Sequence, residues 1–428
     1  METLIDFFSF KYPNVKYVVL GTILLSVSSS VVGCFTFVKK KSLVGDVISH
    51  AVLPGICISF LISGSKDPFI LIIGAFLSGW VSILVMDNII QNTKIKEDAA
   101  TGFSLSVFFG IGILLLTLIQ HSGNAAQSGL DTFLFGKAAA LVGKDLIAFS
   151  VIAIIVLGIV LALYKEFKLM SFDPQFASVI GLPTKALTFI LTSITVLAVV
   201  TGIQAVGVVL MAAMLITPAA AARFWTNELH KMIFLAAFFG IISGISGAFI
   251  SFTAPSMPTG PWMVMVLSVI ALISFFFAPG KGILIRQYQR LVIQRRLLEE
   301  NLLKALYKLV ESDNRTSEEI TMDDDKLKGF FSPNQLKKGL RRLNSNGYVS
   351  AARSGWILTR EGFQKGKRIT RLHRLWELYL TKYLRIAPDH VHEDAETIEH
   401  IITPELERRL QELLDFPTSD PHQSTIPQ

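Results

Sequence analysis

Long apolar stretches separated by short polar segments make up most of the first 280 residues. A helix needs about 20 mostly apolar residues to cross a bilayer. Nine stretches approach that length, so the pattern predicts nine transmembrane helices, at residues 17–38, 46–63, 68–90, 102–120, 146–164, 186–202, 204–222, 232–252 and 261–278. The turn between the sixth and seventh is very short, which favours a hairpin with a broken helix.

The pattern changes after the last of these stretches. Residues 297–310 have helical apolar spacing, and PNQLKKGLRRLNSN (333–346) reads as a basic amphipathic helix. YVSAARSGWILTREG follows as two short strands, and then come a long basic helix and a last helical pair. The sequence therefore predicts an all-α polytopic membrane protein with a C-terminal winged helix-turn-helix-like domain.

Charge follows the same division. Residues 1–280 contain 15 Lys and Arg and 12 Asp and Glu, whereas the last 148 residues contain 25 and 21. We expect a transmembrane domain at 1–282, a basic helical linker at 283–298 and a soluble domain at 299–428. The arginines of the linker favour contact with anionic membrane lipid. The two cysteines, Cys34 and Cys57, lie in apolar runs and provide no disulfide framework.

The loops differ in positive charge, and this difference predicts the orientation. One set of loops holds ten Lys and Arg residues and the opposite set holds five. Loops rich in Lys and Arg stay in the cytoplasm. The N-terminus is then outside, and nine crossings place the C-terminal domain inside a cell with a reducing cytoplasm.

The stretch GDVISHAVLPG at residues 45–55 places two ionisable groups at the start of an apolar span. Asp46 and His50 are four apart and share one helix face. Pro54 has no N–H, so the carbonyl of His50 loses its helical partner. An oxygen and an imidazole donor suit a divalent first-row ion. The alternative is a core histidine beside an interfacial aspartate, but ionisable groups within a membrane are costly, which favours a functional site.

The cytoplasmic segment SFDPQFASVIG, between the fifth and sixth spans, predicts a short capped helix. Ser171 or Asp173 can cap it, Pro174 suits its first turn and Gly181 can end it. Phe176 is one of its apolar side chains, which could dock in another protein or lie on the membrane surface. The chain has no GxxxxGK[ST] motif, so nucleotide hydrolysis would come from a partner.

Six stretches in order resemble the ABC-transporter permeases that import manganese, zinc or iron: GDVISHAVLPG, KEDAATGFSLSVFFGIG, LDTFLFGKAAALVGKD, FKLMSFDPQFASVIGLP, AVGVVLMAAMLITPAAAA and PTGPWMVMVL with FFFAPGKG. The resemblance implies that Asp46 and His50 line a metal path between two permease subunits, homologous or identical. It also implies an extracytoplasmic metal-binding lipoprotein, a cytoplasmic ABC ATPase docking on the Asp173–Gly181 segment, and location in a bacterial cell membrane.

The tail resembles the diphtheria-toxin-repressor and manganese-transport-regulator family. The resemblance implies metal ligands at His373, Glu396, Glu399 and His400, and spacing places the last three on one helical face. An oxygen ligand at Glu396 favours manganese. The family's first-helix ligands fall at Asn301 and Lys304, and a protonated lysine cannot bind a metal, so the predicted site is partial.

These observations predict the permease subunit of an ATP-driven importer of divalent metal, with manganese favoured and zinc or iron as alternatives. The metal is cargo and no permanently bound cofactor is expected. The tail either senses metal and restrains transport or is an ion-paired remnant. A membrane-tethered transcriptional regulator that binds DNA is a rival interpretation. A membrane metalloprotease is excluded by the lack of an HExxH motif.

Overall fold

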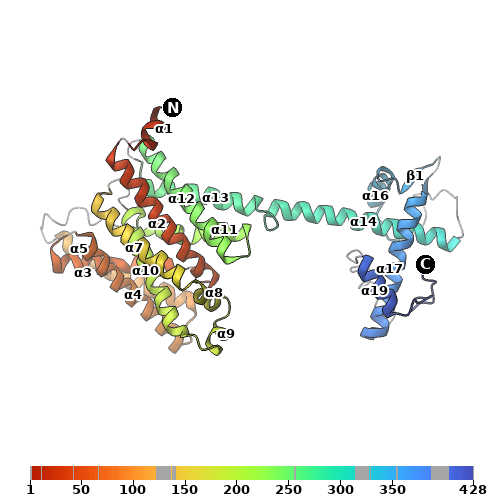
Figure 1. The fold of residues 1–428 in the computed structure, drawn as a ribbon, viewed down its shortest axis with the longest axis horizontal. Coiled ribbons are helices and arrows are strands. Elements are labelled where there is room, and N and C mark those ends of the chain that lie inside the picture. The colour runs from red at the N-terminus through yellow and green to blue at the C-terminus, as the bar shows by residue number, and fades with distance from the viewer. Residues whose placement is uncertain are drawn as a thin grey trace. The chain divides into compact units, whose positions relative to one another are not determined.

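The computed structural model describes residues 2–10, 12–41, 43–65, 67–121, 136, 141–254, 257–313, 327, 329–352, 355–386 and 404–427. The chain divides into two compact units, Met1–Arg286 and Gln287–Gln428. We call them the membrane unit and the tail and describe each by itself (Figure 1).

The membrane unit is built of helices alone in its described part. They are α1 (Glu2–Phe8), α2 (Pro13–Val38), α3 (Val44–Ser63), α4 (Pro68–Asn92), α5 (Glu97–His121), α7 (Gly143–Ala162), α8 (Tyr164–Phe172), α9 (Pro174–Val179), α10 (Thr184–Val206), α11 (Val208–Trp225), α12 (Leu229–Thr253) and α13 (Thr259–Phe277). Each predicted span coincides with one of these helices to within a few residues at each end.

Eight helices in the described residues are long and apolar enough to cross a membrane, so the prediction of nine full spans needs a correction. The predicted span 204–222 is instead the shorter apolar helix Leu210–Trp225 within α11. The physical reason is that α10 continues to Val206 and the chain breaks at Gly207, whose φ of 93° is in a region that favours glycine. The predicted interruption between the sixth and seventh apolar stretches is present, at Gly207.

α2 is the central helix of the membrane unit. It packs against α7, α10, α11 and α12, and 78% of its most apolar window is buried. The corresponding windows of α5 and α13 are only 22% buried, so these helices are peripheral. α3 lies between the centre and the edge, in contact with α4, α5 and α11.

The segment that follows α13 is hydrogen-bonded to the end of α11 and to the turn between α11 and α12. The Lys281 ammonium donates to the carbonyl oxygen of Arg223, at 2.9 Å, and to the Asn227 side chain. Trp225 Nε1 donates to Ser274 Oγ of α13 at 2.9 Å. Three contacts therefore fix the end of α11 to the segment that leads out of the membrane unit.

The described tail contains α14 (Ile283–Asp313), which begins in the membrane unit, then α16 (Pro333–Ser345), β1 (Val349–Ala351), β2 (Trp356–Leu358), α17 (Arg360–Leu384) and α19 (Pro404–Leu413). β1 and β2 pair antiparallel, with Val349 opposite Leu358. Leucines of α14 and α16 form most of the core, which comprises Leu302, Leu303, Leu306, Leu309, Leu327, Leu336, Leu340, Leu343, Val349 and Ile369. α16 starts with a capping box, in which Gln335 Oε1 accepts from the Ser332 N–H at 2.9 Å.

Candidate functional site

Asp46 and His50 both lie on α3, in its first two turns, as the sequence predicts. Both side chains are half-buried, and the Asp46 carboxylate acts electrostatically on the His50 ring. The ring meets Phe109 of α5 edge-on, with centroids 5.0 Å apart and planes at 86°. His50 Nδ1 is buried and makes no hydrogen bond to any residue that the structure describes. A buried polar atom without a partner calls for an explanation, and a bound cation would supply one.

Close packing fixes the position of the helix that carries the pair. A Cβ on Gly45 would lie 3.0 Å from Leu215 of α11, and one on Gly55 would lie 2.0 Å from the carbonyl oxygen of Gly74 in α4. Ser78 Oγ of α4 also donates to the carbonyl oxygen of Ala51 at 2.6 Å. Asp46 and His50 are thus two potential metal ligands on a helix that packs against α4 on one side and α11 on the other. Together they form a rigid half-site.

The half-site cannot enclose an ion. No group of three or more His, Cys, Asp or Glu side chains that could hold a metal occurs in the part of the chain that the structure describes. A closed site needs about four ligands, as in structural zinc sites. Asp46 and His50 therefore fit transient binding of a passing ion, completed by water, backbone oxygens or a second subunit.

Gln204 is a buried amide that the sequence analysis missed. It lies near the end of α10, three residues before the break at Gly207, and its side chain is only 3% exposed. Its Oε1 atom has no hydrogen-bond partner within the described residues. The only signal in the sequence is a lone amide near the end of an apolar span. One buried amide without a second converging donor defines no site.

The predicted cytoplasmic helix forms, and Asp173 rather than Ser171 caps it. α9 runs from Pro174 to Val179, and Asp173 Oδ1 accepts from the Phe176 N–H at 2.9 Å. Gly181 follows with a φ of 88°. The apolar side chains of this segment face outward: Phe172, Phe176 and Ile180 are each 52% exposed and Val179 is 83% exposed. A rigid protrusion with an apolar surface suits docking on another protein.

The predicted metal ligands of the tail are only partly described. Glu396, Glu399 and His400 lie outside the described residues. His373 is on α17, 1% exposed, and its Nε2 is 3.1 Å from Glu377 Oε1 one turn later. Lys304, where the sequence resemblance implies a ligand position, is 5% exposed, and the buried Asn301 Oδ1 has no hydrogen bond within the described residues.

Other buried charges of the tail are also paired. Arg374 donates two hydrogen bonds to Glu311, from Nη1 to Oε1 at 3.0 Å and from Nη2 to Oε2 at 2.6 Å. Burial alone would lower the pKa of Arg374, but the paired Glu311 outweighs burial and holds that pKa above its ordinary value. Glu407 of α19 pairs with Arg368 and Arg371 of α17. These pairs join α14, α17 and α19.

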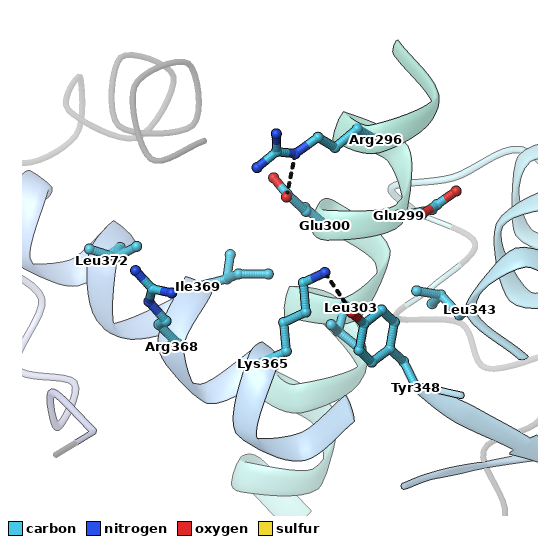
Figure 2. A pocket seen from close by; sticks show the side chains of 10 residues that line it. All are labelled: Arg296, Glu299, Glu300, Leu303, Leu343, Tyr348, Lys365, Arg368, Ile369 and Leu372. Atoms are coloured by element: carbon cyan, nitrogen blue, oxygen red, sulfur yellow. Dashed lines mark hydrogen bonds and ion pairs between the residues drawn. The ribbon is translucent and has the colours of Figure 1, made fainter. Parts of the chain in front are cut away.

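A cavity of about 310 Å³ in the tail is lined by residues of α14, α16, α17 and the segment before β1 (Figure 2). Its charged groups are satisfied locally. Arg296 Nε donates to Glu300 Oε1 at 2.9 Å, and Lys365 Nζ donates to the Tyr348 hydroxyl at 3.1 Å. His373 is not among the lining residues, so this cavity does not expose the predicted metal ligand.

Comparisons with known proteins cover both units. A family model described as the ABC 3 transport family matches residues 11–278. A second model, described as the metal binding and dimerisation domain of iron dependent repressors, matches residues 359–428.

Three relatives place these matches in context. The manganese transport system membrane protein MntC of Bacillus subtilis is 39% identical over 88% of this chain and 86% of its own length. The zinc transport system membrane protein TroC of Treponema pallidum is 45% identical over 65% of this chain and 93% of its own length. The solved structure of PsaBC from Streptococcus pneumoniae in complex with Fab matches with a TM-score of 0.59 and 31% identity, over 68% of this chain and 98% of that one.

Proposed function

This chain belongs to the ABC 3 transport family, and from that membership we propose that it is the permease subunit of an ATP-driven importer of divalent metal ions, with manganese as the favoured cargo. The observation that carries the proposal is the half-site on α3, where Asp46 and a buried, unbonded His50 nitrogen share one helix face. Manganese is favoured because MntC of Bacillus subtilis aligns over both units. Zinc is the alternative, since the zinc transport protein TroC is 45% identical over 65% of this chain.

Uptake into proteoliposomes tests the transport proposal. The permease is reconstituted with its ATPase and binding protein, and ATP-dependent accumulation of Mn²⁺, Zn²⁺ and Fe²⁺ is measured separately. The double variant Asp46→Asn, His50→Gln should lose uptake of every one of the three ions. Asp87→Asn is the matched control, because it removes a carboxylate that pairs with Lys41 at 3.4 Å outside the half-site. Normal uptake by the double variant would contradict the metal path.

We propose that the exposed face of α9 docks on the cytoplasmic ATPase. The support is that Asp173 caps the N-terminus of α9 and that the helix exposes apolar side chains, including Phe176. Phe176→Ala should weaken ATPase binding about tenfold, as expected for an aromatic anchor. Phe234→Ala on α12 is the control, since that side chain is 72% exposed but lies on a membrane span. Equal binding by both variants would contradict docking at α9.

The orientation follows from this docking surface and from the positive loops. We propose that the short helix α11 crosses the membrane in addition to the eight long spans. Nine crossings then place α9 and the tail in the cytoplasm and the N-terminus outside, in a bacterial cell membrane. A binding lipoprotein would then deliver the ion from outside, and a second permease subunit, identical or homologous, would complete the path.

The tail is proposed as a winged-helix domain that senses metal and restrains transport in replete cells. Support comes from the capped basic helix α16, the antiparallel pair β1 and β2 that follows it, and the repressor model that matches from residue 359. His373 with Glu396, Glu399 and His400 would hold the ion. Truncation after about residue 290 should abolish the metal-dependent decline of uptake, and unchanged control of uptake would contradict this role.

DNA binding by the same tail is the rival role, supported by the basic surface of α16. The full chain in nanodiscs is mixed with promoter DNA of its own operon, with and without Mn²⁺. Metal-dependent, promoter-specific retention would favour a tethered regulator, whereas weak binding to any DNA would reflect phosphate electrostatics alone.

A further inference from the structure

The first half of α14 carries an exposed surface with no role in the proposed function. α14 is a single helix of 31 residues, and leucines from Leu302 to Leu309 in its second half enter the tail core. By contrast, every residue from Arg286 to Arg296 is exposed. We call residues 283–296 the juxtamembrane segment.

Large apolar side chains form one stripe on this segment. Leu284, Tyr288, Leu291 and Val292 are 45%, 67%, 51% and 43% exposed. Their spacing of four, seven and eight residues from Leu284 places them on one side of a helix with 3.6 residues per turn. Ile293 lies off this stripe and is also exposed. A contiguous apolar stripe in water is unfavourable and indicates a partner.

The charge on the segment indicates which partner. Arg286 and Arg290 lie on the side opposite the stripe, and Arg295 and Arg296 follow at its end. Residues 283–298 contain no acidic side chain. Arginine guanidinium groups bind phosphate oxygens well, and their long stems allow the charge to reach the surface while the helix lies among lipids.

The position of the segment gives the same answer. α13 ends at Phe277, and only residues 278–282 separate it from α14. Gly280 in that connection has a φ of 81°, which lets the chain turn sharply. The segment therefore starts at the membrane surface where α13 ends, and its four arginines exclude it from spanning the bilayer itself.

We propose that the juxtamembrane segment lies in the headgroup region of the cytoplasmic leaflet, with the Leu284–Val292 stripe among the acyl chains and its arginines on anionic phospholipid. It combines the two features that hold an amphipathic helix at an interface, an apolar face and basic residues beside it. The assignment rests on the membrane spans and on the proposed orientation, and it is independent of which ion is transported.

Nitroxide labels test the depth of the segment in the full-length protein. Both native cysteines, Cys34 and Cys57, are fully buried, so a cysteine introduced on the segment is the accessible one. Tyr288→Cys places a label on the stripe, and Gln289→Cys and Gln294→Cys place matched labels on either side of it. The chain is reconstituted in phosphatidylcholine vesicles with and without phosphatidylglycerol. Collision with oxygen, which enters lipid, and with a water-soluble nickel chelate is then measured.

The label at position 288 should meet oxygen and be shielded from nickel, and the two control labels should meet nickel. Adding Arg286→Gln, Arg290→Gln and Arg295→Gln to Tyr288→Cys should raise the ratio of nickel collision to oxygen collision at position 288 about tenfold or more. This increase should occur only in vesicles with phosphatidylglycerol. Equal nickel access at all three positions would overturn the proposal. Shielding of position 288 from both reagents would also overturn it, because it would show a protein partner.

Discussion

His50 in the membrane unit and His373 in the tail each lie four residues from a carboxylate on the same helix, yet their surroundings differ. The Asp46–His50 pair is half-buried, and His50 Nδ1 has no hydrogen bond within the described residues. In the tail, His373 and Glu377 are 1% and 2% exposed, and their side chains are 3.1 Å apart. Equal spacing in the sequence thus gives an open pair in one unit and a closed pair in the other.

Burial explains the difference. A charge that is almost fully enclosed needs its partner within the protein, because water cannot replace it. A half-buried pair keeps some solvation and can exchange water for a cation. A transport site must also release its ion, which suits the open pair. The closed pair can bind metal only if His373 breaks its contact with Glu377 or if both side chains bind the ion. Metal sensing by the tail therefore implies that these side chains rearrange.

The largest expected effect is on the closed pair. His373→Ala leaves the buried Glu377 carboxylate without this partner and should destabilise the tail by about 4 kcal/mol. The double variant His373→Leu, Glu377→Leu removes both charges and should recover most of that loss. Hydrogen exchange of α17 in the full chain, in the presence of a chelator, measures both. If the double variant is no more stable than the single one, the pair is not closed as described.

Substitution in the Asp46–His50 pair should affect metal uptake rather than the stability of the fold. His50→Gln should reduce ATP-dependent Mn²⁺ uptake about 100-fold, which corresponds to about 2.7 kcal/mol of lost ion binding. His373→Gln should leave uptake at low metal unchanged, which makes it the matched control. Comparable losses in the two variants would remove the distinction between a transport site and a tail site.

The scaffold of the open pair provides a third test. Gly55→Ala forces a Cβ to within 2.0 Å of the Gly74 carbonyl oxygen, and we expect a cost of about 2 kcal/mol together with impaired uptake. Gly110→Ala on α5 is the control, since nothing lies within 4 Å of its added Cβ. Thermal unfolding in detergent compares the two. Equal melting temperatures would show that α3 is not held as tightly as its contacts indicate.

The smallest expected effect is at the α9 cap. Asp173→Ala removes the acceptor for the Phe176 N–H and should destabilise α9 by about 1 kcal/mol. Asp173→Asn, which keeps a capping oxygen, should be nearly neutral. Hydrogen exchange at residues 174–181 reports the change, and identical exchange in both variants would mean that packing, not the cap, holds the segment.

The spans, the α9 cap and the Asp46–His50 face could be predicted from sequence because each depends on local spacing. Apolar length defines a span, and Asp173 followed by Pro174 defines a helix start. The shortened α11 was harder, because the position of a break depends on which glycine can adopt a positive φ in a packed hairpin. Gly207 is one of two glycines in that stretch, the other being Gly202.

The pairing of His373 could not be predicted in the same way. Glu377 follows it by one turn, but the helix also presents Arg371 and Arg374, and sequence alone does not say which charge turns inward. The structure assigns Glu311 to Arg374 across 63 residues and Glu407 to Arg371 across 36. Such choices depend on tertiary contacts between α14, α17 and α19, which local patterns do not encode.

The attachment of Lys281 to the turn after α11 has a mechanical consequence. The connection after α13 is hydrogen-bonded to the C-terminal end of α11 through Lys281. Leu215 and Ala212 of the same helix pack against Gly45. A displacement of residues 278–282 is therefore transmitted to the helix that packs on the residue next to Asp46.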